Sequence, residues 1–129
     1  MAVTKELSVM IENKRGALAE LCSVLAKVAM NIQALMAREQ AGVAHVRLVV
    51  DNLDVARKVL AGLGLKYAEQ DVIPVRVSDK PGALGKLTRK LSDHRVDIKY
   101  CYGSILKGSG EAIIILAVSD MAPGAKVGK

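Results

Sequence analysis

The sequence predicts an α+β protein built from two tandem copies of one βαββ-type unit, with the second copy truncated. Three observations lead to this fold class. The chain aligns with itself when Gly16 is placed over Gly82, a step of 66 residues. In each copy, segments with strand periodicity surround a segment with helix periodicity. A length of 129 residues allows one ordinary domain or two very small ones.

The self-alignment extends well beyond a single motif. Residues 12–18 fall over residues 78–84, and the apolar positions that follow stay in register. The match therefore concerns the architecture of the two copies. The further matched pairs are Val9 with Val75, Leu21 with Leu87, Leu25 with Leu91, Asn31 with Asp97, Ile32 with Ile98, and Gly42 with Gly108.

The first copy opens with a strand, a turn and a helix. Glu6–Ile11 has the β-branched, alternating pattern of a strand, and the turn Asn13–Gly16 follows it. The next residues place apolar side chains on one helical stripe. Two more strands, Ile32–Arg38 and Ala44–Val50, are joined by a hairpin that carries Gly42. The stripe consists of Leu18, Leu21, Cys22, Leu25 and Val28.

A second helix and a fourth strand complete the first copy. Asp54–Gly62 has its apolar residues on one side, and Gly62 and Gly64 stop it. Leu65–Gln70 then supplies the strand. The unit is therefore βαββαβ, the ferredoxin-like arrangement, and we place it at residues 1–70.

The second copy repeats the first half of this pattern. We predict a strand at Val72–Val77, a turn at Asp79–Gly82, a helix with Leu84, Leu87 and Leu91 on its apolar face, and strands at Ile98–Leu106 and Glu111–Val118. This unit occupies residues 71–120. The remaining nine residues, 121–129, include Pro123, Gly124 and Gly128, so we expect a tail there and no further helix or strand.

A truncated unit leaves a sheet edge and part of a sheet face uncovered. We expect a second chain or the first copy to cover them, and we therefore predict a homodimer. The core must be packed by Val, Ile, Leu, Met and Ala, because the chain has no Phe and no Trp.

Composition argues against several classes of protein. The net charge is +6, but the basic residues are scattered and the stacking aromatics that single-strand binders use are almost absent, which disfavours nucleic acid. Cys22 and Cys101 have no metal-binding spacing. No leader and no membrane-spanning segment is predicted, so we expect a cytoplasmic protein without membrane contact.

The turn before each first helix has the residues that a small zwitterion needs. A helix start offers backbone N–H groups without intrahelical partners, and a carboxylate binds well there. Gly16 and Gly82 have no Cβ, so ligand atoms can approach the backbone closely. Asn13 and Asp79 add a side-chain oxygen that can accept from an ammonium group. Free amino acids carry both of these groups.

A purely structural interpretation of the same turns stays open. Asn or Asp before a helix is often an N-cap, and Gly is often a turn residue. The helix terminus alone contributes about 0.3–1 kcal/mol, whereas millimolar binding needs roughly 4 kcal/mol. Further contacts are required, and the pairs Asn31-Ile32 and Asp97-Ile98, which align with each other, are candidates.

These residues resemble the ACT domain family. The resemblance lies in the turn Asp79-Lys80-Pro81-Gly82-Ala83-Leu84 and in an Asn-Ile or Asp-Ile pair at the second strand of a βαββαβ unit. It covers about residues 5–120, and the tandem pair is similar to the stand-alone double-ACT proteins of bacteria and archaea. Arg15 departs from the family pattern, which usually has Pro at this position.

The resemblance implies a fold and a function. ACT modules have antiparallel sheets with helices on one face, bind amino acids at interfaces between modules, and regulate an attached or separate metabolic enzyme. By this resemblance the ligand-binding residues of one site are Asn13, Lys14, Gly16, Ala17, Leu18, Asn31 and Ile32. Those of the other site are Asp79, Gly82, Ala83, Leu84, Asp97 and Ile98.

No catalytic motif, metal-ligand set or cofactor motif is present, so we predict neither an enzyme nor a cofactor. Two other functions stay open beside the amino-acid sensor. One is a ligand-free regulatory module that docks on a metabolic enzyme by strand addition. The other, less favoured, is a basic accessory protein for nucleic acid.

Overall fold

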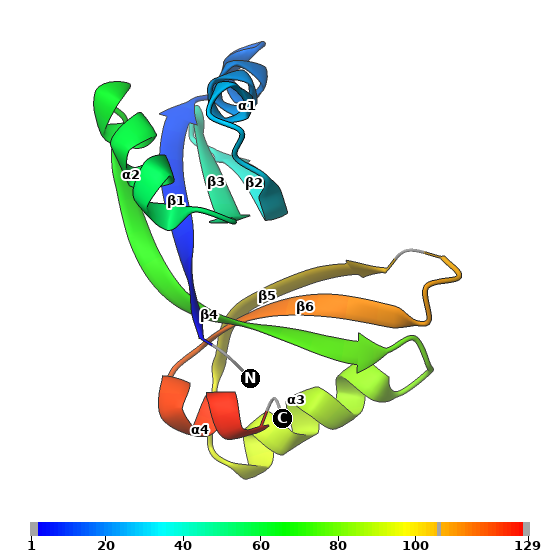
Figure 1. Ribbon diagram of the computed structural model, residues 1–129. Helices are drawn as coiled ribbons and strands as arrows, with labels where there is room; N and C mark the ends of the chain where they lie inside the picture. The colour runs from blue at the N-terminus through cyan, green and yellow to red at the C-terminus, as the bar shows by residue number, and fades with distance from the viewer. Residues whose placement is uncertain (1–2, 106, 128–129) are drawn as a thin grey trace. The chain divides into compact units, whose positions relative to one another are not determined.

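The computed structural model describes residues 3–105 and 107–127, with side chains up to residue 124 (Figure 1). The chain divides into two compact units. The first unit is Lys5–Gln70, and the second contains the chain from Asp71 onward together with Val3 and Thr4. Leu106, the last residue of one predicted strand, and residues 128–129 of the predicted tail lie outside the described residues.

The first unit has a four-stranded sheet with two helices. Its strands lie in the order β2-β3-β1-β4, and β3 pairs antiparallel with both β1 and β2. The strand β4 contributes its first residues here. In chain order the elements are β1 (Thr4–Glu12), α1 (Ala17–Lys27), β2 (Ile32–Gln40), β3 (Val43–Val50), α2 (Leu53–Gly62) and β4 (Tyr67–Ser78).

The core of the first unit lies between one face of its sheet and the two helices, because alternate strand residues point to that face. Leu7 and Val9 of β1 have no exposed surface, and Leu25 of α1 and Leu60 of α2 pack in the same buried cluster. The predicted helical stripe of α1 is confirmed at Leu21 and Leu25, whereas Val28 is exposed.

The second unit repeats this arrangement around the rest of β4. Its strands lie in the order β4-β6-β5, and β6 pairs antiparallel with both neighbours. Its core is aliphatic, like that of the first unit, with Ile73, Leu91 and Leu116 almost fully buried. The remaining elements are α3 (Ala83–Asp93), β5 (Ile98–Ile105), β6 (Glu111–Val118) and α4 (Met121–Val127).

The predicted α+β class and the order of strands and helices up to β6 are confirmed, but two details differ. The strands expected at Leu65–Gln70 and Val72–Val77 are one continuous strand, β4, because nothing between them breaks the extended chain. The hairpin of the second unit is also longer than that of the first. Glu39 pairs with Ala44, whereas Ile105 pairs with Ala112, so two extra residues lie in the second hairpin.

The tail expected at 121–129 is wrong for residues 121–127, which form the helix α4. Pro123 lies in the first turn of α4, where a missing N–H costs no intrahelical hydrogen bond. Gly124 is buried, and its amide donates to the Asp120 carbonyl at 3.2 Å. The second unit therefore has a second helix, and the truncation that the sequence predicted is not confirmed.

Candidate functional site

The two turns before α1 and α3 have nearly identical backbone geometry. Gly16 has φ 86° and ψ −9°, and Gly82 has φ 89° and ψ −10°, both in the left-handed region that favours glycine. Each turn is also fixed to the nearby hairpin by its first residue. The amide of Asn13 donates to the Gly42 carbonyl at 3.1 Å, and that of Asp79 donates to the Gly110 carbonyl at 2.9 Å.

In the described part of the chain, no side chain caps the start of α1 or α3. In α2 the Asn52 side chain accepts a hydrogen bond from the Val55 amide at 3.2 Å, which is ordinary N-capping. In α1 and α3 the N-cap residue is a glycine, and no side-chain cap is present. The interpretation of Asn13 and Asp79 as N-caps is therefore wrong.

The missing caps leave backbone donors without partners at both turns. Among the described residues, no acceptor reaches the amides of Leu18 and Ala19 at the start of α1, or those of Leu84 and Gly85 at the start of α3. A Cβ built on Gly16 or Gly82 would meet no atom within 4 Å, so the space beside each glycine is open. These amides can donate hydrogen bonds to a carboxylate that arrives from solvent.

The turn of the first unit borders a small hollow of about 200 Å³ beside the β2–β3 hairpin. Four predicted residues line it together: Asn13, Lys14, Ala17 and Leu18. Arg38 and Glu39 of the hairpin line it as well, which places both a cation and an anion near the turn. This hollow is referred to below as the hairpin-side hollow.

Arg38 and Glu39 are not among the site residues that the sequence predicted. Their side chains are already bound locally, because Arg38 donates to Gln40 Oε1 and Glu39 Oε1 accepts from the Gly42 amide, both at 2.9 Å. The only sequence signal was the predicted hairpin itself, which brings β2 residues back to the turn. At the matching positions of the second unit the chain has Ser104 and Ile105, so this charge pair is specific to the first unit.

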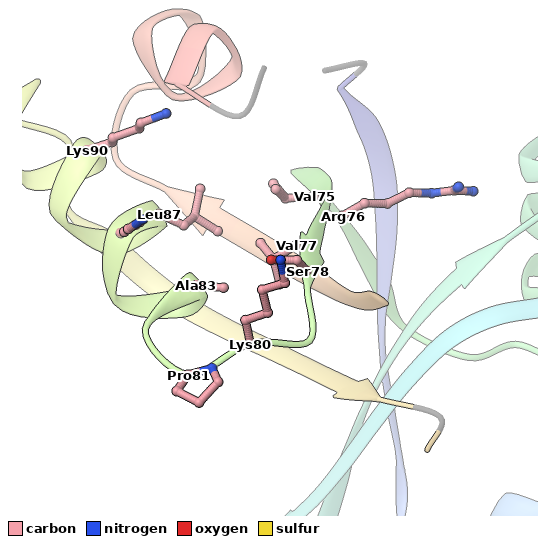
Figure 2. Close-up of a pocket in the computed structure, with 10 residues that line it drawn as sticks. Val75, Arg76, Val77, Ser78, Lys80, Pro81, Ala83, Leu87 and Lys90 are labelled. Carbon is pink, nitrogen blue, oxygen red and sulfur yellow. The ribbon is translucent and has the colours of Figure 1, made fainter. Parts of the chain in front are cut away.

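The turn of the second unit borders a different hollow, of about 360 Å³, between the end of β4 and α3 (Figure 2). Lys80 and Ala83 line this hollow together with Pro81. The predicted residues Asp79, Gly82 and Leu84 are exposed beside it.

The predicted strand-start residues lie far from the turns of their own units. Asn31 lies beside Asp51 at one end of β3, where its carbonyl accepts from the Asp51 amide at 3.2 Å. Asn13 lies beside Gly42 at the other end of β3, about 30 Å away at the usual rise over the nine steps from Gly42 to Asp51. One unit therefore does not bring Asn31-Ile32 together with Asn13–Leu18.

The second unit has the same separation. The Asp97 carbonyl accepts from the Ser119 amide at 2.9 Å at one end of β6, whereas Asp79 lies beside Gly110 at the other end. Ile98 packs against the core of its unit, as Ile32 does in the first unit. Each unit thus has a turn at one end and an exposed Asn or Asp at the other.

The described part of the chain has no helix that is both long and apolar enough to cross a membrane. Nor do three or more His, Cys, Asp or Glu side chains in that part come close enough to hold a metal ion.

Comparison with known proteins gives the family. The sequence profile of the ACT domain pair matches residues 1–126. A solved structure of a protein from Bacteroides thetaiotaomicron is 34% identical, with a TM-score of 0.91, and the match covers 97% of this chain and 85% of that one. A search of curated proteins finds no match.

More distant structures share the fold. The regulatory subunit of aspartate kinase from Thermus thermophilus, in a ligand-free form, is 14% identical with a TM-score of 0.67, over 91% of this chain and 88% of that one. The corresponding subunit from Thermus flavus is 13% identical with a TM-score of 0.65, over 98% and 92%. The family profile and the 34% identical structure confirm the resemblance in the sequence: this chain belongs to the ACT domain pair family.

Proposed function

We propose that this ACT domain pair is a non-catalytic sensor that binds a free amino acid as a regulatory ligand at its helix-start turns. The main support for the proposal is that α1 and α3 both start without a side-chain cap among the described residues. Both are opened by a left-handed glycine with free space beside it, and both leave two backbone amides without acceptors among the described residues.

The chemistry at each turn suits the two ends of an amino acid. The α-carboxylate would accept hydrogen bonds from Leu18 and Ala19, or from Leu84 and Gly85, with the helix dipole adding favourable charge. The ammonium group would donate to the side-chain oxygen of Asn13 or to the carboxylate of Asp79. In the first unit, Arg38 and Glu39 supply a further charge of each sign at the hairpin-side hollow.

The strand-start residues enter the site from another molecule. A ligand that touches a turn and also Asn31-Ile32 or Asp97-Ile98 must bridge two units, because these pairs lie at the far end of their own units. We assign the second contribution to another copy of the chain, which makes the sensor a homodimer. A ligand that binds between two copies favours one arrangement of the dimer by its difference in affinity for the alternatives.

Such a sensor would regulate the activity of a separate enzyme of amino-acid metabolism. We base this part of the proposal on two structures with a similar fold, both of regulatory subunits of aspartate kinase. A cytoplasmic setting follows from the same role.

A thermal-shift screen of the twenty amino acids tests the proposal. A ligand that binds only the folded protein stabilises it by about 2.7 kcal/mol at a concentration of 100 times Kd, which raises the melting temperature by roughly 10 °C for a chain of this size. We expect one amino acid, or a small chemically related group, to give a saturable shift. If none does so at millimolar concentration, the protein is better described as a ligand-free docking module.

A further inference from the structure

The second unit carries a hollow whose charge differs from that of its counterpart in the first unit. This hollow of about 360 Å³ lies between the end of β4 and α3 (Figure 2). Its floor is apolar, with Val75 and Leu87 buried and Val77 and Ala83 half-buried. We refer to it as the lysine-rimmed hollow, because Lys80, Lys86 and Lys90 surround this floor.

Four cationic residues line the hollow. Lys80, Lys86 and Lys90 surround its floor, whereas the Arg76 side chain extends away from α3 (Figure 2). Figure 2 shows the Lys80 side chain running from the turn toward Ser78, while Arg76 extends away from α3. Arg76 also lies 3.8 Å from the Glu111 carboxylate. Lys86 and Lys90 come from α3 at i and i+4, so their ammonium groups belong to one helix face.

No acidic residue in the described part of the chain pairs with these three lysines. Among the described residues, no carboxylate lies within ion-pair distance of Lys80, Lys86 or Lys90, and no acidic residue lines the hollow. Like charges at i and i+4 repel each other, and an anion in the hollow would relieve that repulsion.

The corresponding hollow of the first unit has a different set of charges on its rim. Its hollow, of about 800 Å³, is lined at the matching positions but also by residues 63–66. The floor residues match, since Ile11, Ala17 and Leu21 correspond to Val77, Ala83 and Leu87. The rim matches only at Lys14, the counterpart of Lys80. Glu12, Glu20 and Val24 stand where the second unit has Ser78, Lys86 and Lys90.

We infer that the lysine-rimmed hollow binds a small organic dianion. Three ammonium groups around an apolar floor fit a ligand with two anionic groups on a short apolar body, and a volume of about 360 Å³ is at the lower end of small-molecule sites. The anionic groups are carboxylates or a phosphate monoester, since lysine binds either as a point charge. The hollow shares Ala83 with the predicted amino-acid site of the second turn, but its ligand needs no ammonium group, and Lys86 and Lys90 lie outside that predicted site.

The test uses succinate and glycerol 3-phosphate as probes, titrated calorimetrically at low ionic strength. The variant Lys86→Gln/Lys90→Gln removes two rim charges without changing helix propensity much. Its matched control, Arg89→Gln/Lys99→Gln, removes two charges from exposed positions of the same unit that do not line the hollow.

We expect at least one probe to bind the unmodified protein saturably and to bind the Lys86→Gln/Lys90→Gln variant about tenfold more weakly or worse, with the control unchanged. Added salt should weaken binding to the unmodified protein. Tighter binding of succinate would identify a dicarboxylate site, and tighter binding of glycerol 3-phosphate a phosphate site. Equal affinity of both variants, or no saturable binding of either probe, would overturn the inference. Neither result depends on whether a neutral amino acid binds at the turns.

Discussion

At the residue scale, the proposed function depends on two glycines, Gly16 and Gly82, and on the backbone amides that follow them. Gly16 and Gly82 were predictable from the repeat, because a duplicated Gly before a helix marks a turn with special backbone geometry. The absence of a side-chain cap was not predictable. Asn13 and Asp79 have the right chemistry to cap, but their own amides are fixed to the hairpins and place them too early for capping.

Leu84 offers the cleanest test of the amides at the start of α3. Substitution of Gly82 would strain the backbone, because its φ is 89°, whereas Leu84 is helical and 47% exposed. We expect Leu84→Glu to weaken amino-acid binding by about tenfold or more, since its carboxylate competes for the free amides and repels the ligand. Isothermal titration calorimetry measures the affinity.

The matched control is Leu84→Gln, which has the same shape but no charge. It should bind within about threefold of the unmodified protein, because the helix propensities of Gln and Glu are similar. Equal affinities of the Glu and Gln variants would remove the second turn from the site.

Alanine substitutions at two glycines of the second unit, Gly103 and Gly85, should change the free energy of unfolding in opposite directions. A Cβ on Gly103 would lie 2.6 Å from the Ile113 carbonyl and would also collide with Ile114 Cδ1, whereas a Cβ on Gly85 would meet nothing. We expect Gly103→Ala to lower the free energy of unfolding by about 1–3 kcal/mol. Gly85→Ala should raise it by about 0.5–1 kcal/mol, since Gly85 lies within α3. Urea denaturation measures both, and a Gly103→Ala variant as stable as the unmodified protein would contradict the β5–β6 packing.

At the element scale, α4 is the helix that the sequence pattern did not predict. Its seven residues include Pro and Gly, which normally break helices. Both are acceptable here, one for a local and one for a tertiary reason. Pro123 lies in the first turn, where a backbone N–H would have no intrahelical acceptor. Gly124 allows the helix to approach Val118 and Ile73. Periodicity cannot reveal such a contact, because it depends on residues of other elements.

Gly124→Ala tests this packing. The added methyl group would lie 2.8 Å from Val118 Cγ2 and 3.3 Å from Ile73 Cδ1, so α4 must move away from the core. We expect the free energy of unfolding to fall by about 1–2 kcal/mol, although Ala favours helix formation. As a control, Gly62→Ala adds a methyl group at the end of α2, where no atom lies within 4 Å, and it should not destabilise the protein. An increase in stability of the Gly124 variant would show that α4 is not packed as described.

At the scale of the whole molecule, the sequence predicted two tandem units and the family, because the repeat and the turn motif are local patterns. It could not predict which predicted site residues meet. Asn13 and Asn31 are close in the sequence but lie at opposite ends of β3, since α1 carries the chain from one end to the other. Arg38 and Glu39 show the converse, because the hairpin folds them back beside a turn that lies earlier in the chain.

This separation predicts that assembly and ligand binding are linked. Light scattering should show a particle of about twice the protomer mass of 13.7 kDa, and the amino acid that binds should favour this dimer. We expect Asn31→Ala to weaken both the ligand affinity and the effect of the ligand on assembly, because Asn31 would contact a ligand held by the other copy. A protein that stays monomeric with the ligand bound would contradict the bridging arrangement.

The central claim, that free backbone amides at the turns hold the carboxylate of an amino acid, can be tested by nitrogen-15 NMR titration of the full chain. The binding amino acid should shift the amide signals of Leu18 and Ala19, of Leu84 and Gly85, or of both pairs, along saturable curves with one dissociation constant for each turn. If an amino acid binds while all four amide signals stay in place, the ligand lies elsewhere and the account of these turns is wrong.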